Sequence, residues 1–388
     1  MNILIISTID TGGGGARIPW NIMAGLKEKG HKVSMFVGYK NSNDPDVHKI
    51  PLNPLYYRLS KFFATDLRFA RSSCIFNTKE YKGADVINCH NIHSGFFNWS
   101  DFQRIVKEKK VVWTIHDLWP MTSGYTDTYR KKIDEPKRFF GFLWDNRPKL
   151  LEEKEKLYKN SFFYTVAVSD YIREEIRQSV LGHLPCRLIY NSVDTKTFKP
   201  YNKIQTRKEL DLPIDKKIIL FVAPKGINAK LKGADYFKKL AKKYTHKKDW
   251  LFVAIGNERH RDKIKIENIL DIGRISDRLT MAKYYSAADV FLYPSLADSF
   301  GLVVAEAMAC GLPVVSFDTG GIPGIISDLG YIAKYENLED LDNGLNKMLS
   351  IDKREYDLIS AKCAKRIKDV FPLKKMIDRY ENLFYEIA

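Results

Sequence analysis

Cysteine is scarce in this sequence, and its spacing argues against two common kinds of site. Only five cysteines occur among 388 residues, which is an odd number. No two of them form a C-x-x-C pair, so neither a disulfide framework nor a thiolate zinc site is indicated. We therefore expect a protein of a reducing compartment, the cytoplasm.

Long apolar runs are also absent. No stretch reaches the roughly 18 apolar residues that a membrane-spanning helix needs. The first residues, Met1–Ile9, have no basic region and no small-residue cleavage site, so they are more typical of a buried strand than of a signal peptide.

Acidic residues are outnumbered by basic ones. The chain has 63 Lys and Arg against 47 Asp and Glu, a formal net charge of +16. Such an excess suits nucleic acid, an anionic membrane surface or phosphorylated substrates. A polyanion-binding protein is therefore one alternative function, and it predicts binding that weakens steeply with salt.

Apolar runs alternate with amphipathic stretches along both halves of the chain. Strands rich in Val and Ile that alternate with helices indicate a parallel sheet covered on both faces. A turn-rich connection, Asn191–Pro200, separates two such sets. The sequence thus predicts an α/β fold with doubly wound domains at residues 1–195 and 196–370, followed by an amphipathic helix at Leu373–Ile387. We expect strands at 1–8, 32–37, 85–89, 110–116, 162–168, 187–190, 217–223, 250–255, 289–293 and 313–316, and helices at 16–29 and 234–244.

A loop and a helix that follow one predicted strand hold the most informative residues. Gly301 allows close approach of the backbone to a ligand, and the free N–H groups of the helix that begins there suit a diphosphate. Glu306 can accept hydrogen bonds from ribose hydroxyls, and Asp298 from sugar hydroxyls. A structural role is the alternative, with Asp298 and Ser299 as capping residues and Glu306 on a solvated helix face.

This segment resembles the signature of the retaining GT-B glycosyltransferases of family 4. That signature reads Glu, seven residues, Glu, Ala-Met-Ala-x-Gly-x-Pro-Val-Val and then Gly-Gly. The chain has Asp298, seven residues, Glu306, then Ala307–Val315 and Gly320-Gly321. Asp298 departs from the pattern, because it is one methylene shorter than Glu, and donor preference can differ accordingly.

The resemblance implies a GT-B fold of two facing Rossmann-like domains with an interdomain cleft. Residues 1–195 would form the acceptor-side domain and 196–370 the nucleotide-sugar domain. Residues 371–388 would form a helix that crosses back to the first domain. Asn191–Pro200 is similar to the family's domain junction.

The family holds the donor diphosphate with an Arg after the first strand of the second domain and with a later Lys-Gly pair. Lys232-Gly233 matches the pair. The Arg position falls at about Pro224, so Lys225 or Lys230 would supply the missing cation. We favour Lys225 because it is nearer to the strand end; a solvated lysine is the alternative for each.

A glycine-rich loop, Thr11–Arg17, follows the first predicted strand. A dinucleotide fingerprint would require a third glycine where Arg17 stands and an acid at the end of the second strand. That strand ends at Val37–Lys40 without an acid, so NAD binding is disfavoured. In the family such a loop approaches donor phosphate or acceptor, and Arg17 would steer a phosphate-bearing group or lie on the helix surface.

His116 follows another predicted strand and begins the motif His-Asp-x-Trp-Pro. The family has a cleft histidine here that contacts the donor sugar, and the motif resembles a subgroup of bacterial exopolysaccharide and O-antigen glycosyltransferases. Asp117 would orient the imidazole or contact the acceptor. His90, His93 and His116 could together suit zinc, but no carboxylate spacing supports it and the resemblance implies no metal or cofactor.

Two segments, Tyr56–Arg71 and Arg130–Lys159, mix aromatic and basic residues. A helix of this kind can lie on an anionic membrane, or it can pack on the core with a solvated basic face. We therefore expect a cytoplasmic protein, with possible peripheral contact at the inner face of the membrane.

The sequence predicts a retaining hexosyltransferase-type enzyme that moves a sugar from a nucleoside-diphosphate sugar to a glycan or lipid-linked acceptor in surface polysaccharide synthesis. Nucleic acid is not expected as a partner. A GT-B epimerase or phosphorylase is the enzymatic alternative, although no pyridoxal lysine or epimerase acid pair is found.

The expected catalytic residues are His116, Lys232, Asp298 and Glu306. The expected donor-binding residues are Gly14, Lys225, Lys232, Ser299, Phe300, Gly301, Leu302 and Glu306, and the acceptor-side residues are Gly13, Gly15, Arg17 and Asp117.

Overall fold

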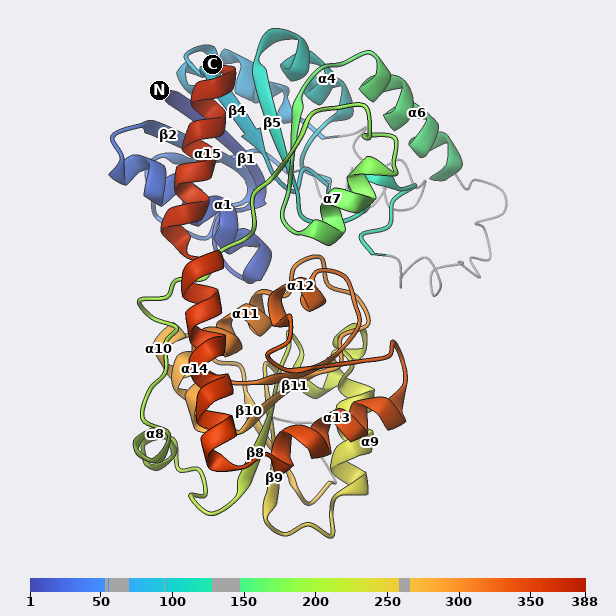
Figure 1. The fold of residues 1–388 in the computed structure, drawn as a ribbon. Helices are drawn as coiled ribbons and strands as arrows, with labels where there is room; N and C mark the ends of the chain where they lie inside the picture. The colour runs from blue at the N-terminus through green and yellow to red at the C-terminus, as the bar shows by residue number, and fades with distance from the viewer. Residues whose placement is uncertain (53–54, 56–69, 94, 128–146, 258–265) are drawn as a thin grey trace. The chain divides into compact units, whose positions relative to one another are not determined.

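The computed structural model describes residues 1–52, 55, 70–93, 95–127, 147–257 and 266–388. The chain divides into two compact units. Unit 1 consists of Met1–Asn191 and Lys374–Ala388, and unit 2 of Ser192–Leu373. The domain limits predicted from the sequence, after residues 195 and 370, lie close to these divisions. Each unit is an α/β sandwich with helices on both faces of its sheet (Figure 1).

The sheet of unit 1 is entirely parallel, with the strand order β3-β2-β1-β4-β5-β6-β7. The interior strand β1 contains the apolar run Ile3–Ile6, and its Leu4, Ile5 and Ile6 are fully buried. This burial is expected where helices cover both faces. The strands are β1 (Asn2–Ile9), β2 (Lys32–Tyr39), β3 (Val47–Lys49), β4 (Val86–Cys89), β5 (Lys110–Ile115), β6 (Tyr164–Ala167) and β7 (Cys186–Leu188). The helices are α1 (Gly14–Glu28), α3 (Lys79–Lys82), α4 (Trp99–Glu108), α6 (Arg147–Lys159), α7 (Asp170–Arg177) and α15 (Leu373–Ile387), with short 3-10 helices η1 (Ser72–Asn77) and η2 (Trp119–Met121).

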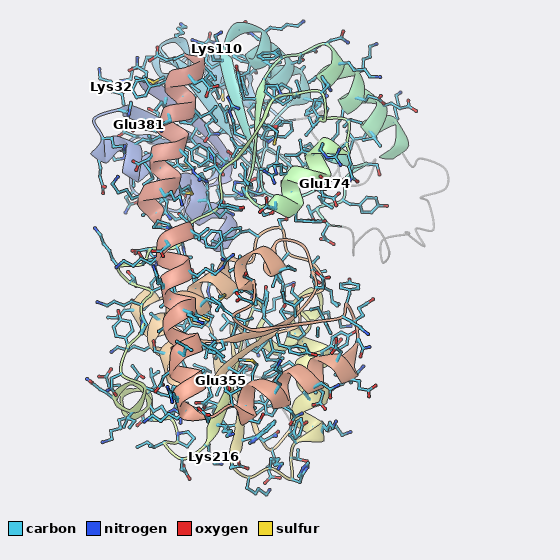
Figure 2. All side chains as sticks on the ribbon, in the orientation of Figure 1. Lys32, Lys110, Glu174, Lys216, Glu355 and Glu381 are labelled. Carbon is cyan, nitrogen blue, oxygen red and sulfur yellow. The ribbon has the colours of Figure 1, made fainter. Side chains whose placement is uncertain are left out.

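The C-terminal helix α15 packs on unit 1 through the apolar face that the sequence predicted. Ile377 and Tyr380 are buried. A Cβ on Gly25 of α1 would lie 2.0 Å from the Cδ1 of Ile377, so only glycine allows α1 and α15 to approach this closely. Glu381 of α15, which is labelled in Figure 2, has its Oε1 2.8 Å from the Nε2 of His31.

The sheet of unit 2 is also parallel, with the strand order β10-β9-β8-β11-β12-β13. The strands are β8 (Lys217–Val222), β9 (Trp250–Ile255), β10 (Ile269–Gly273), β11 (Val290–Tyr293), β12 (Val314–Phe317) and β13 (Tyr331–Ala333). The α-helices are α8 (Lys203–Glu209), α9 (Ala234–Lys243), α10 (Arg278–Ala287), α11 (Leu302–Ala309), α12 (Ile322–Ile326), α13 (Leu338–Ser350) and α14 (Lys353–Val370), and the short 3-10 helices are η3 (Gly226–Asn228) and η4 (Lys230–Lys232).

The strands that the sequence predicted are confirmed with shifts of a few residues, but three strands escaped prediction. These are β3, β10 and β13, and all three lie at sheet edges. An edge strand has one neighbour and an open side, so it carries polar residues and lacks the long apolar run of a central strand. His48 and Lys49 in β3 and Asp271 in β10 are such residues.

The parallel strands determine where functional groups collect. In a parallel sheet the loops that follow the strands meet at one edge, the carboxyl edge, where ligands of such folds bind. The loops after β1, β4 and β5 therefore meet in unit 1, and those after β8, β11 and β12 meet in unit 2. In the part of the chain that is described, no helix has the length and apolar character to cross a membrane.

Candidate active site

At the carboxyl edge of unit 2, an ion pair joins Lys232 and Asp298. The Nζ of Lys232 lies 2.9 Å from the Oδ2 of Asp298 and donates to the carbonyl oxygen of Ala297 at 2.8 Å. The hydroxyl of Tyr293 donates to the same Oδ2 at 2.9 Å. Burial, assisted by the charge of Asp298, raises the pKa of Tyr293 well above its ordinary value, so the hydroxyl keeps its proton. The other oxygen of Asp298, Oδ1, has no bonding partner among the described residues and can accept from a ligand.

The backbone at Gly233 sets the position of Lys232. Gly233 has φ +80°, and a Cβ there would lie 1.8 Å from the carbonyl oxygen of Pro294. No other residue fits this contact between the start of α9 and the loop after β11. The Lys-Gly pair recognised in the sequence is thus a close packing contact that holds the amine beside Asp298.

Gly301 precedes helix α11 with φ +97°. The N–H groups of Val304 and Ala305 both bond the carbonyl oxygen of Gly301, at 3.0 and 3.1 Å. The N–H groups of Leu302 and Val303 come before the first intrahelical bond and are available to an anion. Glu306 lies in the second turn of α11 and is 8% exposed, so it is not the solvated surface residue of the alternative interpretation.

Two further donor-site predictions fall in the same loop. The ring of Phe300 is buried and packs edge-on against Phe371, with ring centroids 5.7 Å apart. Only the backbone of Phe300 can therefore contact a ligand. Ser299 and Leu302 are half-buried on either side of it.

Lys225 and Lys230 are both exposed after β8. Neither ammonium group has a hydrogen bond or ion pair with any residue that the structure describes. Lys225 has φ +70°, which is uncommon for a residue other than glycine and points to a constrained turn. Both ammonium groups are therefore available to bind a phosphate.

In unit 1 the glycine-rich loop lies beside the loop after β4. Gly13 caps α1, and Gly14 and Gly15 are its first residues, all exposed. The hydroxyl of Thr8 donates to the carbonyl oxygen of Asn91 at 2.6 Å, which joins the ends of β1 and β4. Arg17 lies in the first turn of α1 and is half-buried.

His116 follows β5 and bonds a second histidine. Its Nε2 lies 2.8 Å from the Nδ1 of His90, and the Nε2 of His90 lies 2.8 Å from the Oδ1 of Asn88. Burial lowers the pKa of His116 to about 4, despite the opposing charge of Asp117. Burial and the neighbouring His116 lower the pKa of His90 well below its ordinary value. Both rings are therefore neutral at neutral pH.

Among the described residues, Asp117 bonds His93 and Trp119 and does not bond His116, so it does not orient that imidazole directly. Its Oδ2 lies 2.9 Å from the Nε2 of His93, and its Oδ1 accepts from the backbone N–H of Trp119 at 2.9 Å. The hydrogen-bond partner of His116 is instead His90, a residue that the sequence suggested only for a metal. Its place directly after β4, the neighbour of β5, is the signal that could have revealed it.

His90 bonds His116, and His93 bonds Asp117, so the three histidines do not converge on one point as a zinc site would require. Within the described ranges, no group of three or more His, Cys, Asp or Glu side chains is arranged to hold a metal ion.

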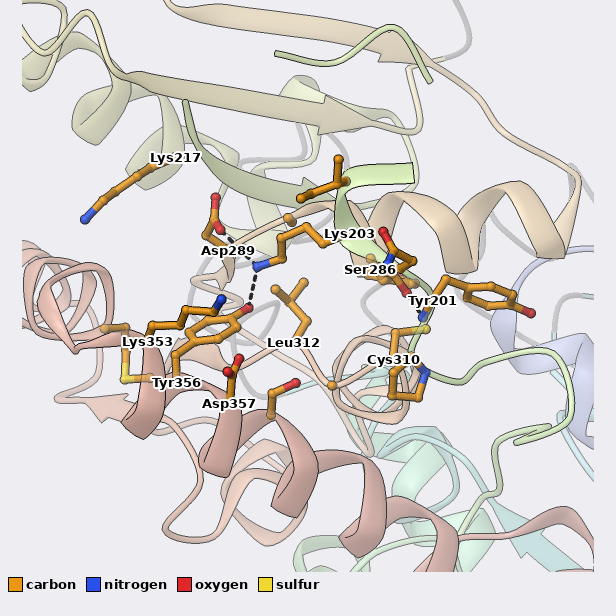
Figure 3. A pocket seen from close by; sticks show the side chains of 18 of the residues that line it. Tyr201, Lys203, Lys217, Ser286, Asp289, Cys310, Leu312, Lys353, Tyr356 and Asp357 are labelled. Atoms are coloured by element: carbon orange, nitrogen blue, oxygen red, sulfur yellow. Dashed lines mark hydrogen bonds and ion pairs between the residues drawn. The ribbon is translucent and has the colours of Figure 1, made fainter. Parts of the chain in front are cut away.

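A cavity of about 590 Å³ opens elsewhere in unit 2 (Figure 3). Residues at the starts of β8, β11 and β12 line it, namely Lys217, Asp289 and Leu312. It therefore lies at the amino edge of the sheet, opposite to the edge where ligands of such folds bind. Lys203 is already bonded there, to Asp289 at 3.0 Å and to the hydroxyl of Tyr356 at 3.1 Å. We assign this cavity no part in the active site.

Comparison with known proteins agrees with the division of the chain. Residues 12–197 match the family described as Glycosyltransferase Family 4, and residues 202–364 match Glycosyl transferases group 1. The chain is 28% identical over 323 residues to an uncharacterized 41.2 kDa protein in the cps region of Klebsiella pneumoniae, covering 80% of this chain and 81% of that protein.

Solved structures share the fold over almost the full length. Sucrose-phosphate synthase from Thermosynechococcus elongatus has a TM-score of 0.75 at 20% identity, covering 99% of this chain and 98% of that one. Anabaena HepE, in complex with UDP and glucose, has a TM-score of 0.70 at 15% identity, covering 99% of each chain. The chain is therefore a glycosyltransferase of the GT-B fold.

Proposed function

We propose that this glycosyltransferase moves a sugar from a nucleoside-diphosphate sugar to an acceptor hydroxyl with retention of anomeric configuration. The observation that carries the proposal is the Lys232–Asp298 pair beside the amino end of α11. A cation, free N–H groups and a carboxylate collected at one carboxyl edge suit a diphosphate and an attached sugar. The complexes of HepE with UDP-glucose, UDP and glucose support a donor of this kind.

The leaving diphosphate gains negative charge as the bond to the sugar breaks. Lys232 and the N–H groups of Leu302 and Val303 would stabilise that charge. Lys225 would supply the second cation in place of the family's arginine. Glu306 would accept hydrogen bonds from the ribose hydroxyls.

The sugar would be held by Asp298 through its available Oδ1 and by His116. The bond from the anomeric carbon to the diphosphate oxygen breaks, and the acceptor oxygen bonds that carbon from the same face. The acceptor proton passes to the departing diphosphate oxygen, so no protein nucleophile is needed.

The acceptor would be a glycan or a lipid-linked glycan of surface polysaccharide synthesis. Gly13, Gly15, Arg17 and Asp117 are the proposed acceptor-side residues. The Klebsiella relative, placed by its description in a cps region, supports this class. The His-Asp-x-Trp-Pro motif supports the exopolysaccharide or O-antigen subgroup.

We further propose that the reaction needs no metal or cofactor and occurs on the cytoplasmic side of the membrane. Of the two aromatic and basic segments, 56–69 and 128–146 lie outside the described residues. Helix α6, from the second segment, buries Lys154, whose Nζ donates to the carbonyl oxygen of Thr122 at 2.9 Å. Lys154 is therefore not available to an anionic membrane surface.

A donor panel tests the proposal. The protein is incubated with UDP-, GDP- and other nucleotide sugars, with and without EDTA, and release of nucleotide is measured. We expect one donor to be consumed slowly to water, faster with acceptor, and equally in EDTA. If no donor is bound or consumed, the transfer reaction is excluded; dependence on added metal would overturn the metal-free mechanism.

A further inference from the structure

A buried chain of hydrogen bonds in unit 1 leads to His116. The Nδ2 of Asn88 donates to the carbonyl oxygen of Val112 at 3.1 Å and to the hydroxyl of Thr114 at 3.2 Å. A carbonyl oxygen can only accept, so this side of the Asn88 amide is the nitrogen. The hydroxyl of Thr114 also bonds that of Tyr380 in α15 at 3.0 Å, and this anchors the chain at its far end.

The direction of the remaining bonds follows from chemistry. The Oδ1 of Asn88 can only accept, so the Nε2 of His90, 2.8 Å away, carries a hydrogen. His90 is 1% exposed and neutral, so its Nδ1 has no hydrogen and accepts. The Nε2 of His116 is the group 2.8 Å from that Nδ1, and it must therefore carry a hydrogen.

The other nitrogen of His116 is then an acceptor. A neutral imidazole with a hydrogen on Nε2 has a lone pair on Nδ1. No hydrogen bond to this Nδ1 exists within the described part of the chain. A hydroxyl would donate to it, whereas a carboxylate or phosphate oxygen would face it lone pair to lone pair.

We propose that His90 and Asn88 are positioning residues that fix His116 as a hydrogen-bond acceptor, so that the sugar group facing it is a hydroxyl and not an anionic group. This inference rests on the proposed function, in which His116 contacts the donor sugar. It disfavours any donor sugar that would place a carboxylate or phosphate group against this nitrogen.

The titratable groups around His116 do not change its neutral state or the position of its hydrogen. Three titratable groups act on His116, namely His90 after β4, His93 in the same loop, and Asp117. Asp117 favours protonation of His116, but its oxygens are bonded to His93 and to Trp119. Burial outweighs its charge and holds the pKa of His116 at about 4.

The first test reads the tautomers directly in the wild-type protein, without a substrate. Protein labelled with ¹⁵N-histidine is studied by NMR, and the His90 and His116 signals are assigned by their loss in His90→Phe and His116→Phe. We expect both rings to be neutral with the hydrogen on Nε2 at neutral pH. A hydrogen on the Nδ1 of His116, or a charged ring there, would overturn the proposal even if the enzyme is active.

The second test asks whether His90 acts through His116. With the donor identified by the panel, His90→Phe should raise the KM for donor about tenfold, the effect of one substrate hydrogen bond, with little change in kcat. The double variant with His116→Phe should be no worse than His116→Phe alone. Additive losses would show that His90 has only a structural role.

A matched control completes the design. His31→Phe replaces another buried histidine of unit 1, bonded to Glu381, and should leave the donor KM unchanged. Failure of every donor in the panel would refute the proposed function and leave the NMR result standing.

Discussion

The ammonium group of Lys232 and the carboxylate of Asp298 lie 2.9 Å apart and form one ion pair in unit 2. The sequence suggested separate roles for them, the lysine on diphosphate and the aspartate on sugar. Their contact means that each orients the other, so substitution of one will alter the function of both.

Lys232→Met should lower kcat/KM by about 100-fold or more, because it removes a cation from the developing charge on the diphosphate. Asp298→Asn should have a smaller effect on nucleotide binding, since an amide oxygen still accepts from Tyr293 and the side chain of Lys232 is retained. Steady-state kinetics and calorimetry with the nucleoside diphosphate measure the two effects. Equal loss of nucleotide affinity in both variants would contradict the division of roles.

Glu306→Gln should weaken binding of the nucleoside diphosphate about tenfold, because a neutral amide is a poorer acceptor for two ribose hydroxyls. The substitution keeps the shape of a residue that is 8% exposed, so the fold should persist. Calorimetric titration measures the affinity, and circular dichroism checks the fold. Unchanged affinity would remove Glu306 from the ribose site.

Lys225→Ala should weaken diphosphate binding more than Lys230→Ala does. Both side chains are exposed, and Lys225 is closer to the end of β8. The two variants change net charge equally, so each serves as the control for the other. If Lys230→Ala has the larger effect at two salt concentrations, the second cation is Lys230.

Gly233→Ala should destabilise the protein by about 3 kcal/mol or more, because the new Cβ would lie 1.8 Å from the carbonyl oxygen of Pro294 at a strained φ. Gly30→Ala is the matched control. Gly30 has φ +89° with nothing within 4 Å of the added Cβ, so its cost should be only about 1 kcal/mol. Urea denaturation compares them, and equal costs would show that the contact with Pro294 is not tight.

Acid should destabilise unit 1 through its buried histidines. The pKa of His116 falls from 6.5 in the unfolded chain to about 4 in the folded one. Between these values the unfolded chain binds protons that the folded chain does not, so the free energy of unfolding decreases as the pH falls through this window. The decrease is up to about 1.4 kcal/mol per pH unit for each such histidine.

Urea denaturation at about pH 7.5 and about pH 5 measures this effect. In His116→Phe the difference between the two pH values should shrink. A difference as large as that of the wild type would mean that His116 is charged in the folded protein.

Strong local patterns made much of this molecule predictable. Central strands such as β1 are buried on both faces and read as continuous apolar runs, and α15 showed its buried face by helical spacing. The edge strands β3, β10 and β13 gave no such signal, because a strand with one open side carries polar residues and lacks a long apolar run.

The sequence by itself determined the α/β class, the two sets of parallel strands and the residues that follow each strand, Asp298 and Lys232 among them. Only the tertiary structure decided which of these side chains bond to one another. The Lys232–Asp298 pair spans 66 positions, and the bonds from Tyr380 through Thr114, Asn88 and His90 to His116 join β4, β5 and α15. Such contacts depend on strand order and close packing, which no local pattern of residues records.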